Sequence, residues 1–127
     1  MSQSISRSEA REVAFRIIFS GSGAEALDIS LDGKKATEPE MKFINKILDT
    51  VQTQGAAIDE KISGSLVGWT IDRLNKTDLA VLRLAAAEIS IGEVPKPVII
   101  NECVNIAKKY GVESSGGFVN GVLCKFL

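Results

Sequence analysis

Three arginines near the N-terminus are the residues of this sequence best suited to bind a charged ligand. Arg7 and Arg11 stand four positions apart, which places them on one face of a helix, and Arg16 lies at the edge of that face. The planar donor set of a guanidinium group suits phosphate oxygens. Glu9 and Glu12 alternate with the arginines and dilute the positive charge. The face is therefore either an anion-binding surface or a solvated surface on which Arg7 pairs with Glu12 or another acid.

Side chains for catalysis are missing from the usual combinations. The sequence has no histidine and two cysteines, which removes imidazole bases, Ser–His or Cys–His pairs and most zinc sites. Cys103 and Cys124 fall in apolar helical patterns, and we expect buried free thiols. Acid pairs such as Glu38 and Glu40 stand at helix starts, where negative charge complements the helix dipole. We therefore expect a protein that is not an enzyme, with no catalytic residues, metal site or cofactor.

Two phenylalanines stand near the ends of predicted helices. Phe19 or Phe118 could stack on an unpaired base, an interaction worth ~1–3 kcal/mol per base. Packing in the core is the alternative use of either side chain, above all for Phe118.

Arg83 lies inside an apolar helical pattern. Such an arginine usually extends its stem to the surface or pairs with an acid. We expect a structural role, with Asp72, Asp78 or Glu102 as the partner.

Composition describes an ordinary globular chain. Of its 127 residues, 45% are hydrophobic and 24% are charged, and the net charge is −1. A chain of this length forms one domain that buries about two-thirds of its unfolded surface. A net charge near zero excludes binding of nucleic acid by the whole chain's electrostatic field. The N-terminus has no apolar run of a signal peptide, and no stretch approaches the ~18 apolar residues of a membrane span. We therefore expect a cytoplasmic protein without membrane contact.

Capping patterns predict where several helices begin and end. Ser6–Glu9 is a capping box for the first helix, which we expect to end near Gly21 or Gly23. Thr37–Glu40 is a second capping box, with proline in the first turn. Asn75 suits the N-cap of a later helix, with Asp78 in its first turn.

The C-terminal half contains the clearest helices. Apolar residues surround most of the helix over residues 79–89, which is typical of a central helix. The next helix begins near Pro97 and is expected to end at Gly111 in a left-handed conformation. Ser114 or Ser115 is expected to cap the last helix.

The whole pattern predicts an all-α fold of six or seven helices. Residues 24–31 could form a further short helix, and Trp69 is expected to anchor its segment in the core. Residues 98–100 form the one strand-like run, but helical spacing follows it. We expect a single domain over residues 1–127, built as a compact double three-helix bundle with sub-bundles at about 1–67 and 68–127.

Several motifs in this order and spacing resemble the NusB family of bacterial transcription antitermination factors. They are Arg11-Glu12 with the run from Ala14 to Phe19, Trp69-Thr70-Ile71-Asp72-Arg73-Leu74, the run from Asp78 to Ala85, Ile100-Asn101-Glu102, Ala107-Lys108-Lys109-Tyr110-Gly111, and Phe118-Val119-Asn120-Gly121-Val122-Leu123. The family fold is an all-helical double bundle, which agrees with the pattern of helices.

The resemblance implies a function in transcription. Family members pair with NusE, a small-subunit ribosomal protein, and the pair binds the single-stranded boxA element of nascent ribosomal RNA transcripts. With other Nus factors this lets RNA polymerase read through terminators. Recognition of unstacked single strands is the common mode of sequence-specific RNA binding. The resemblance implies no cofactor.

The resemblance also implies an RNA surface at both ends of the chain. The matching positions, together with Arg16 at the edge of the first helix, are Arg7, Arg11, Phe19, Asp78, Ser114 and Phe118. Ser8 and Glu9 stand where relatives often have basic residues, and Gly117 stands where many have lysine. Each lost phosphate contact lowers the affinity for RNA and makes that affinity less dependent on salt concentration. We expect weaker RNA binding than in a basic relative, with more dependence on the protein partner.

Two other functions are compatible with these residues. One is the helical RNA-binding accessory domain of ribosomal RNA cytosine methyltransferases, which a Rossmann-like domain should follow, whereas this sequence ends at Leu127. The other is a structural or storage homodimer that uses the surface otherwise available to RNA. Light scattering with and without boxA RNA would separate a regulated dimer from a structural one.

Overall fold

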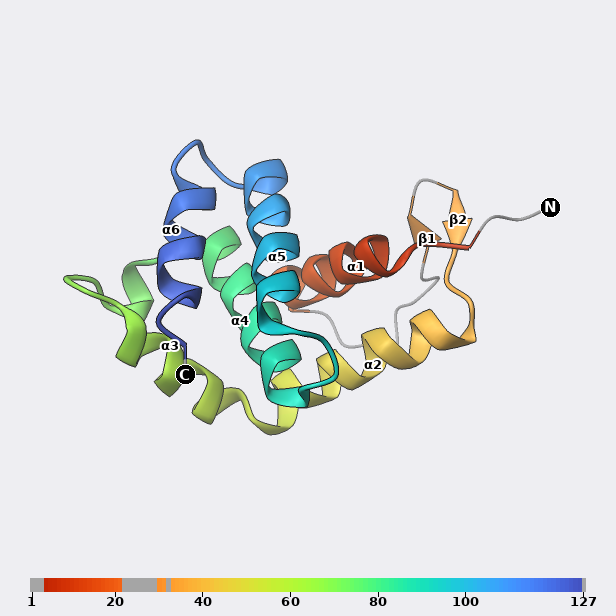
Figure 1. The fold of residues 1–127 in the computed structure, drawn as a ribbon, viewed down its shortest axis with the longest axis horizontal. Coiled ribbons are helices and arrows are strands. Elements are labelled where there is room, and N and C mark those ends of the chain that lie inside the picture. The colour runs from red at the N-terminus through yellow and green to blue at the C-terminus, as the bar shows by residue number, and fades with distance from the viewer. Residues whose placement is uncertain (1–3, 22–29, 32, 127) are drawn as a thin grey trace.

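The computed structural model describes residues 4–21, 30–31 and 33–126, and this part of the chain is mainly helical (Figure 1). The helices are α1 (Arg7–Ser20), α2 (Glu38–Thr53), α3 (Gly55–Ser65), α4 (Lys76–Ile91), α5 (Lys96–Tyr110) and α6 (Ser115–Leu123), with the 3₁₀ turn η2 (Ile71–Arg73) before α4. A short antiparallel ribbon joins β1 (Ser30–Leu31) to β2 (Lys34–Lys35). The all-α prediction, with six helices and one 3₁₀ turn in the described residues, is confirmed.

Helix α4 lies at the centre of the fold. It contacts α1, α2, α3, α5 and α6, which surround it (Figure 1). Val81, Leu82, Leu84 and Ala85 are fully buried, as expected for a helix with apolar residues around most of its circumference. The sub-bundle boundary near residue 67 stays a prediction, because α4 packs against helices from both halves of the chain.

Three of the predicted helix ends form as the sequence indicates. The Ser6 hydroxyl accepts the Glu9 amide at 3.0 Å, and Glu9 accepts the Ser6 amide at 2.9 Å, which completes the capping box. Gly21 ends α1 with φ of 70°, a conformation that favours glycine. The Asn75 side chain accepts the Asp78 amide at 2.7 Å at the start of α4.

Two predicted caps form differently. The Thr37 hydroxyl donates to the Glu40 carboxylate and makes no side-chain cap to the backbone. Gly111 has φ of −93° and ψ of −164°, so it is extended and not left-handed. A Cβ at this glycine would lie 2.4 Å from Ser115 Oγ and 2.7 Å from the Ala107 carbonyl. Gly111 is therefore needed for the close turn between α5 and α6.

The prediction that Trp69 anchors its segment in the core is wrong. Its side chain is 57% exposed. Leu66 and Ile71, on either side of it, pack against the core. The segment between α3 and η2 is thus held by its two ends, and the tryptophan between them faces outward.

The remaining local predictions have mixed outcomes. Residues 98–100 lie within α5, as helical spacing indicated. The short helix suggested for residues 24–31 falls largely outside the described residues, and its last two residues form β1. Both cysteines are free, but only Cys103 is buried, whereas Cys124 is exposed. Among the described residues, the helices are too short or too polar to cross a membrane.

Candidate nucleic-acid interface

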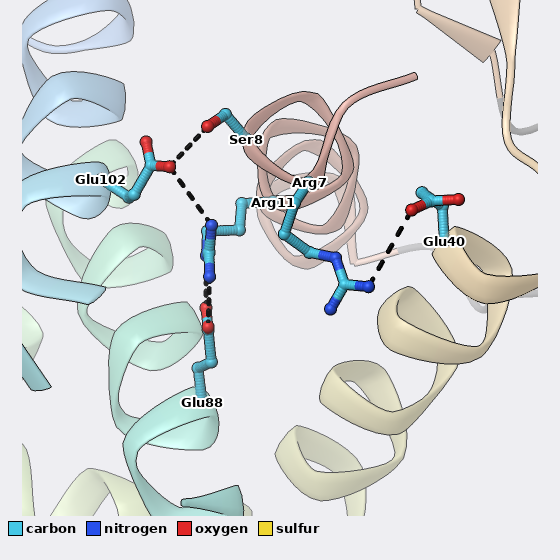
Figure 2. A network of polar contacts seen from close by, with 6 residues as sticks. All are labelled: Arg7, Ser8, Arg11, Glu40, Glu88 and Glu102. Carbon is cyan, nitrogen blue, oxygen red and sulfur yellow. Dashed lines mark hydrogen bonds and ion pairs between the residues drawn. The ribbon is translucent and has the colours of Figure 1, made fainter. Parts of the chain in front are cut away.

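Arg11 lies in a buried network that joins three helices (Figure 2). Its Nε and Nη2 atoms each lie 2.7 Å from a carboxylate oxygen of Glu88 on α4. Nη1 lies 3.3 Å from Glu102 on α5, which also accepts the Ser8 hydroxyl. Burial opposes the charge of Arg11, but its hydrogen bonds to Glu88 and the negative charges of Glu88 and Glu102 together prevail and raise its pKa.

The direct RNA contact predicted for Arg11 stays a prediction, and the surroundings of its side chain favour a structural role. Its side chain is 3% exposed, and its donors already face two carboxylates. A fork in this position does not reach the surface. Arg11 instead fixes the orientation of α1 against α4 and α5.

Arg7 lies on the same helix but faces α2. Its guanidinium carbon lies 4.2 Å from the centre of the Phe43 ring, and Nη2 lies 3.9 Å from Glu40 (Figure 2). The sequence suggested Glu12 as its partner, whereas the structure gives Glu40. With 46% of its side chain exposed, Arg7 remains partly available to a ligand.

Arg83 has the structural role expected of it, with a different partner. Its Nε and Nη2 atoms each lie 2.9 Å from a carboxylate oxygen of Asp59 on α3. Asp72, Asp78 and Glu102 are not the partner, because α3 packs directly against α4 and brings Asp59 to this position.

The second half of α1 forms an aromatic and polar cluster with the end of α5. The Phe15 ring centre lies 5.0 Å from that of Tyr110 and 6.0 Å from that of Phe19. The Nε atom of Arg16 donates to the Tyr110 hydroxyl at 3.1 Å. Sequence reasoning used Tyr110 only as part of a family motif. The available signal was its place at the end of an amphipathic helix, where an aromatic ring with a hydroxyl often meets both core and solvent.

Asp78 lies in the first turn of α4 with an unused acceptor. Its side chain is buried, at 6% exposure. One oxygen, Oδ2, accepts the Asn75 side-chain amide at 3.0 Å. The other, Oδ1, has no hydrogen-bond partner among the residues that the structure describes. Nearby, Lys76 Nζ lies 4.9 Å from the centre of the Phe19 ring, which joins the start of α4 to the end of α1.

The start of α6 carries the last two predicted site residues. Ser114 is exposed and makes no side-chain cap. Ser115, the alternative cap, is buried, and its hydroxyl accepts the Val112 amide at 3.0 Å. Phe118 is partly buried and packs against the core, which fits the structural use that the sequence left open.

Five predicted residues lie on α1, α4 and α6 or directly before α6, near helix ends whose helices contact one another, a region we call the helix-end surface. Figure 1 shows the N-terminal ends of α4 and α6 beside the C-terminal end of α5. The Arg16–Tyr110 and Lys76–Phe19 contacts bring the second half of α1 to the same place. The members of the surface are Arg16, Phe19, Asp78, Ser114 and Phe118. Arg7 and Arg11 lie apart from it, on the first turns of α1.

The helix-end surface has features that favour an anionic ligand. Two helix N-termini carry the positive ends of their dipoles. Lys108 lies across the first turn of α6, where a Cβ on Gly116 would approach its Cγ to 2.9 Å. The carboxylates of Asp78 and of Glu12, which lies against Tyr110 and Lys109, oppose this field.

The fold and this surface define an all-helical binding module built around one central helix. A family model described as the NusB family matches residues 8–127. The transcription antitermination protein NusB of Clostridium novyi is 37% identical over 127 residues, covering 94% of this chain and 96% of that protein. The chain therefore belongs to the NusB family. It is a transcription antitermination factor and not an enzyme, as the sequence predicted.

Solved structures agree with this assignment. A structure of T. maritima NusB matches with a TM-score of 0.83 and 29% identity, covering 98% of this chain and 92% of that one. A crystal structure of the antitermination factors NusB and NusE in complex with double-stranded RNA matches with a TM-score of 0.79 and 28% identity, covering 94% of both chains.

Proposed function

We propose that this chain pairs with a NusE-type small-subunit ribosomal protein and that the pair binds single-stranded boxA RNA in nascent ribosomal transcripts. With other Nus factors, the complex lets RNA polymerase read through terminators in the cytoplasm. The observation that carries the proposal is the exposed Phe19 ring, which lies against Lys76 in the first turn of α4, the turn that also contains Asp78.

A buried acceptor without a partner is costly. Leaving it unsatisfied costs about 1–3 kcal/mol, and more when the group is charged. An N–H donor of a ligand relieves that cost, and the amino groups of RNA bases and the amides of a protein are such donors. Asp78 Oδ1 is itself buried, so a ligand N–H group reaches it only when binding opens the start of α4.

Phe19 supplies the second element of a single-strand site. Its ring is 37% exposed, and Lys76 lies near it at the start of α4. An unstacked base can lie on an exposed aromatic ring, whereas a base inside a duplex cannot. This arrangement supports single-stranded RNA as the ligand. The related complex of NusB and NusE with double-stranded RNA supports a NusE-type protein and an RNA as the partners.

The arginines support a modest electrostatic contribution. Arg11 is buried and Arg7 is shared with Glu40 and Phe43. Few phosphate contacts give a shallow dependence of affinity on salt. The proposal therefore keeps the expectation that RNA affinity depends strongly on the protein partner.

The test measures fluorescence anisotropy of labelled boxA RNA, with and without the NusE-type protein. We expect Phe19→Ala to weaken binding by about tenfold to a hundredfold, the loss of one stacked base. Met41→Ala is the control, because Met41 is 42% exposed on α2, away from the helix-end surface. Equal affinity of Phe19→Ala and the wild type would reject the proposed site. Equal affinity of the wild type for boxA and scrambled RNA would reject the proposed function.

A further inference from the structure

We propose that Glu12 and Tyr110 hold Arg16 as a phosphate-binding fork for the RNA backbone. Glu12 and Tyr110 are then positioning residues. The contact with the RNA backbone lies in the second half of α1, and not in its first turn as the sequence suggested. The inference depends on the proposed RNA-binding function and names a contact within it.

Arg16 differs from the other two arginines of α1. Arg7 and Arg11 have carboxylate partners, Glu40 for the first and Glu88 with Glu102 for the second. Arg16 is exposed, and no carboxylate lies within ion-pair distance of it in the described part of the chain. The Glu12 carboxylate attracts Arg16 without forming an ion pair with it, so the guanidinium group still has donors available to an anion.

One contact of Arg16 fixes the direction of its fork. The Nε atom donates to the Tyr110 hydroxyl at 3.1 Å, and the guanidinium carbon lies 5.7 Å from the centre of the Tyr110 ring. This contact uses one of five donors and leaves both terminal nitrogens. Two terminal N–H groups in one plane match two oxygens of a phosphate.

The Tyr110 hydroxyl is itself oriented. It donates to the Glu12 carboxylate, so its oxygen lone pairs remain for Arg16. Glu12 is buried and also accepts Lys109 Nζ at 2.7 Å. The Tyr110 ring lies 5.0 Å from the Phe15 ring, which restricts its rotation. Arg16 thus donates to Tyr110, and Tyr110 donates to Glu12, so the three side chains form one continuous chain of hydrogen bonds.

The protonation states of Tyr110 and Glu12 preserve these donor and acceptor roles across the physiological pH range. Burial and the hydrogen bond to Glu12 raise the pKa of the Tyr110 hydroxyl, so it retains its proton. Burial opposes the charge of Glu12, but hydrogen bonds from Lys109 and Tyr110 prevail and lower its pKa. Glu12 therefore stays an acceptor and Tyr110 stays a donor.

The place of Arg16 favours RNA over an acidic protein. Phe19 follows it by three positions, which puts both side chains on adjacent turns of one helix face. A nucleotide whose base stacks on Phe19 has its phosphate within reach of Arg16. A carboxylate of a protein partner could bind Arg16 without any aromatic ring nearby. The position of Phe19 next to Arg16 therefore favours a nucleotide.

A double-mutant cycle tests the inference with labelled boxA RNA and saturating NusE-type protein. The four proteins are the wild type, Arg16→Gln, Tyr110→Phe and the double variant, each measured over a range of salt. We expect Arg16→Gln to weaken binding and to reduce the salt slope by about 0.7, the value for one phosphate on a single strand. Tyr110→Phe keeps the ring but removes the hydroxyl, and we expect it to weaken binding about threefold to tenfold. In the Arg16→Gln background the same change should have no effect.

Control variants and alternative outcomes separate this inference from the proposed function. Lys42→Gln removes one cation from the exposed surface of α2, and we expect no change in RNA affinity. If Arg16→Gln binds RNA like the wild type while Phe19→Ala is weakened, the inference is wrong and the function stands. An equal effect of Tyr110→Phe in both backgrounds rejects its positioning role. Weaker binding of Arg16→Gln to the NusE-type protein without RNA assigns the contact to that protein and overturns the inference. If the wild type does not bind boxA RNA, both proposals fail.

Discussion

Removal of Arg11 should destabilise the fold through the carboxylate that it leaves behind. In the wild type, both oxygens of Glu88 lie 2.7 Å from the Arg11 fork, deep between α1 and α4. Arg11→Met keeps an apolar stem of similar length but removes the charge. Breaking a buried pair by removing one partner costs about 3–5 kcal/mol, because the remaining charge is uncompensated.

That loss is large compared with the total stability of the protein. A domain has a free energy of unfolding of about 5–15 kcal/mol. In urea, with a slope of about 2 kcal/mol per molar, a loss of 4 kcal/mol moves the midpoint by about 2 M. Equilibrium unfolding followed by circular dichroism measures this shift. The matched variant is Arg11→Met with Glu88→Met, which removes both charges and should recover most of the lost free energy.

The same variants separate a structural role of Arg11 from direct RNA contact. Under conditions in which Arg11→Met is folded, we expect its salt slope for boxA binding to equal that of the wild type, because no phosphate contact is lost. A slope lower by about 0.7 would show that Arg11 contacts a phosphate. A loss of less than about 1 kcal/mol in Arg11→Met, or a double variant less stable than the single one, would refute the buried-pair argument.

Two further predictions concern the junction of α1, α5 and α6. Burial opposes the charge of Glu12, but its hydrogen bonds to Lys109 and Tyr110 and the nearby positive charges together prevail and hold its pKa below the ordinary value of 4.5. Its contribution to stability is therefore present above about pH 4.5 and is lost as pH falls through the lowered pKa. As the pH is lowered, the free energy of unfolding should therefore fall less for Glu12→Gln than for the wild type. Identical dependence on pH in the two proteins would contradict the lowered pKa of Glu12. Gly111→Ala should lower stability by about 1–3 kcal/mol in thermal unfolding, because its Cβ would meet Ser115 Oγ at 2.4 Å. Gly64→Ala, in open space within α3, is the control and should stabilise by up to about 1 kcal/mol; a stable Gly111→Ala would show that the turn relaxes.

Signals confined to one helix were sufficient to predict much of the fold. Ser6 and Asn75 cap their helices through neighbours three residues away. The apolar circumference of α4 indicated its central position before any contact was known. Gly111 shows the limit of such signals, because a glycine after a helix fits both a left-handed cap and a close approach. Only the packing of Ser115 against it distinguishes the two.

The candidate site was less predictable because the position of each side chain depends on a partner that is distant in the sequence. Spacing placed Arg7 and Arg11 together and Arg16 at their edge. The structure separates them, since Glu88 lies 77 positions from Arg11 and Tyr110 lies 94 positions from Arg16. A sequence pattern on one helix cannot tell which arginine meets a buried acid. Asp78 was found through the family resemblance, but its unused oxygen depends on the surroundings of α4.

The adjacent residues Arg11 and Glu12 explain how family motifs and the binding surface are connected. Arg11 points inward to Glu88 and Glu102, while Glu12 holds Tyr110 and Lys109 at the end of α5. Two neighbours in sequence thus fix α1 to α4 and α5 from two directions. The position of α1 in turn decides where Phe19 meets the start of α4 and where Arg16 meets the end of α5. We therefore expect the motif residues that identify the family to act on the proposed RNA binding through the orientation of one helix, even where they touch no ligand.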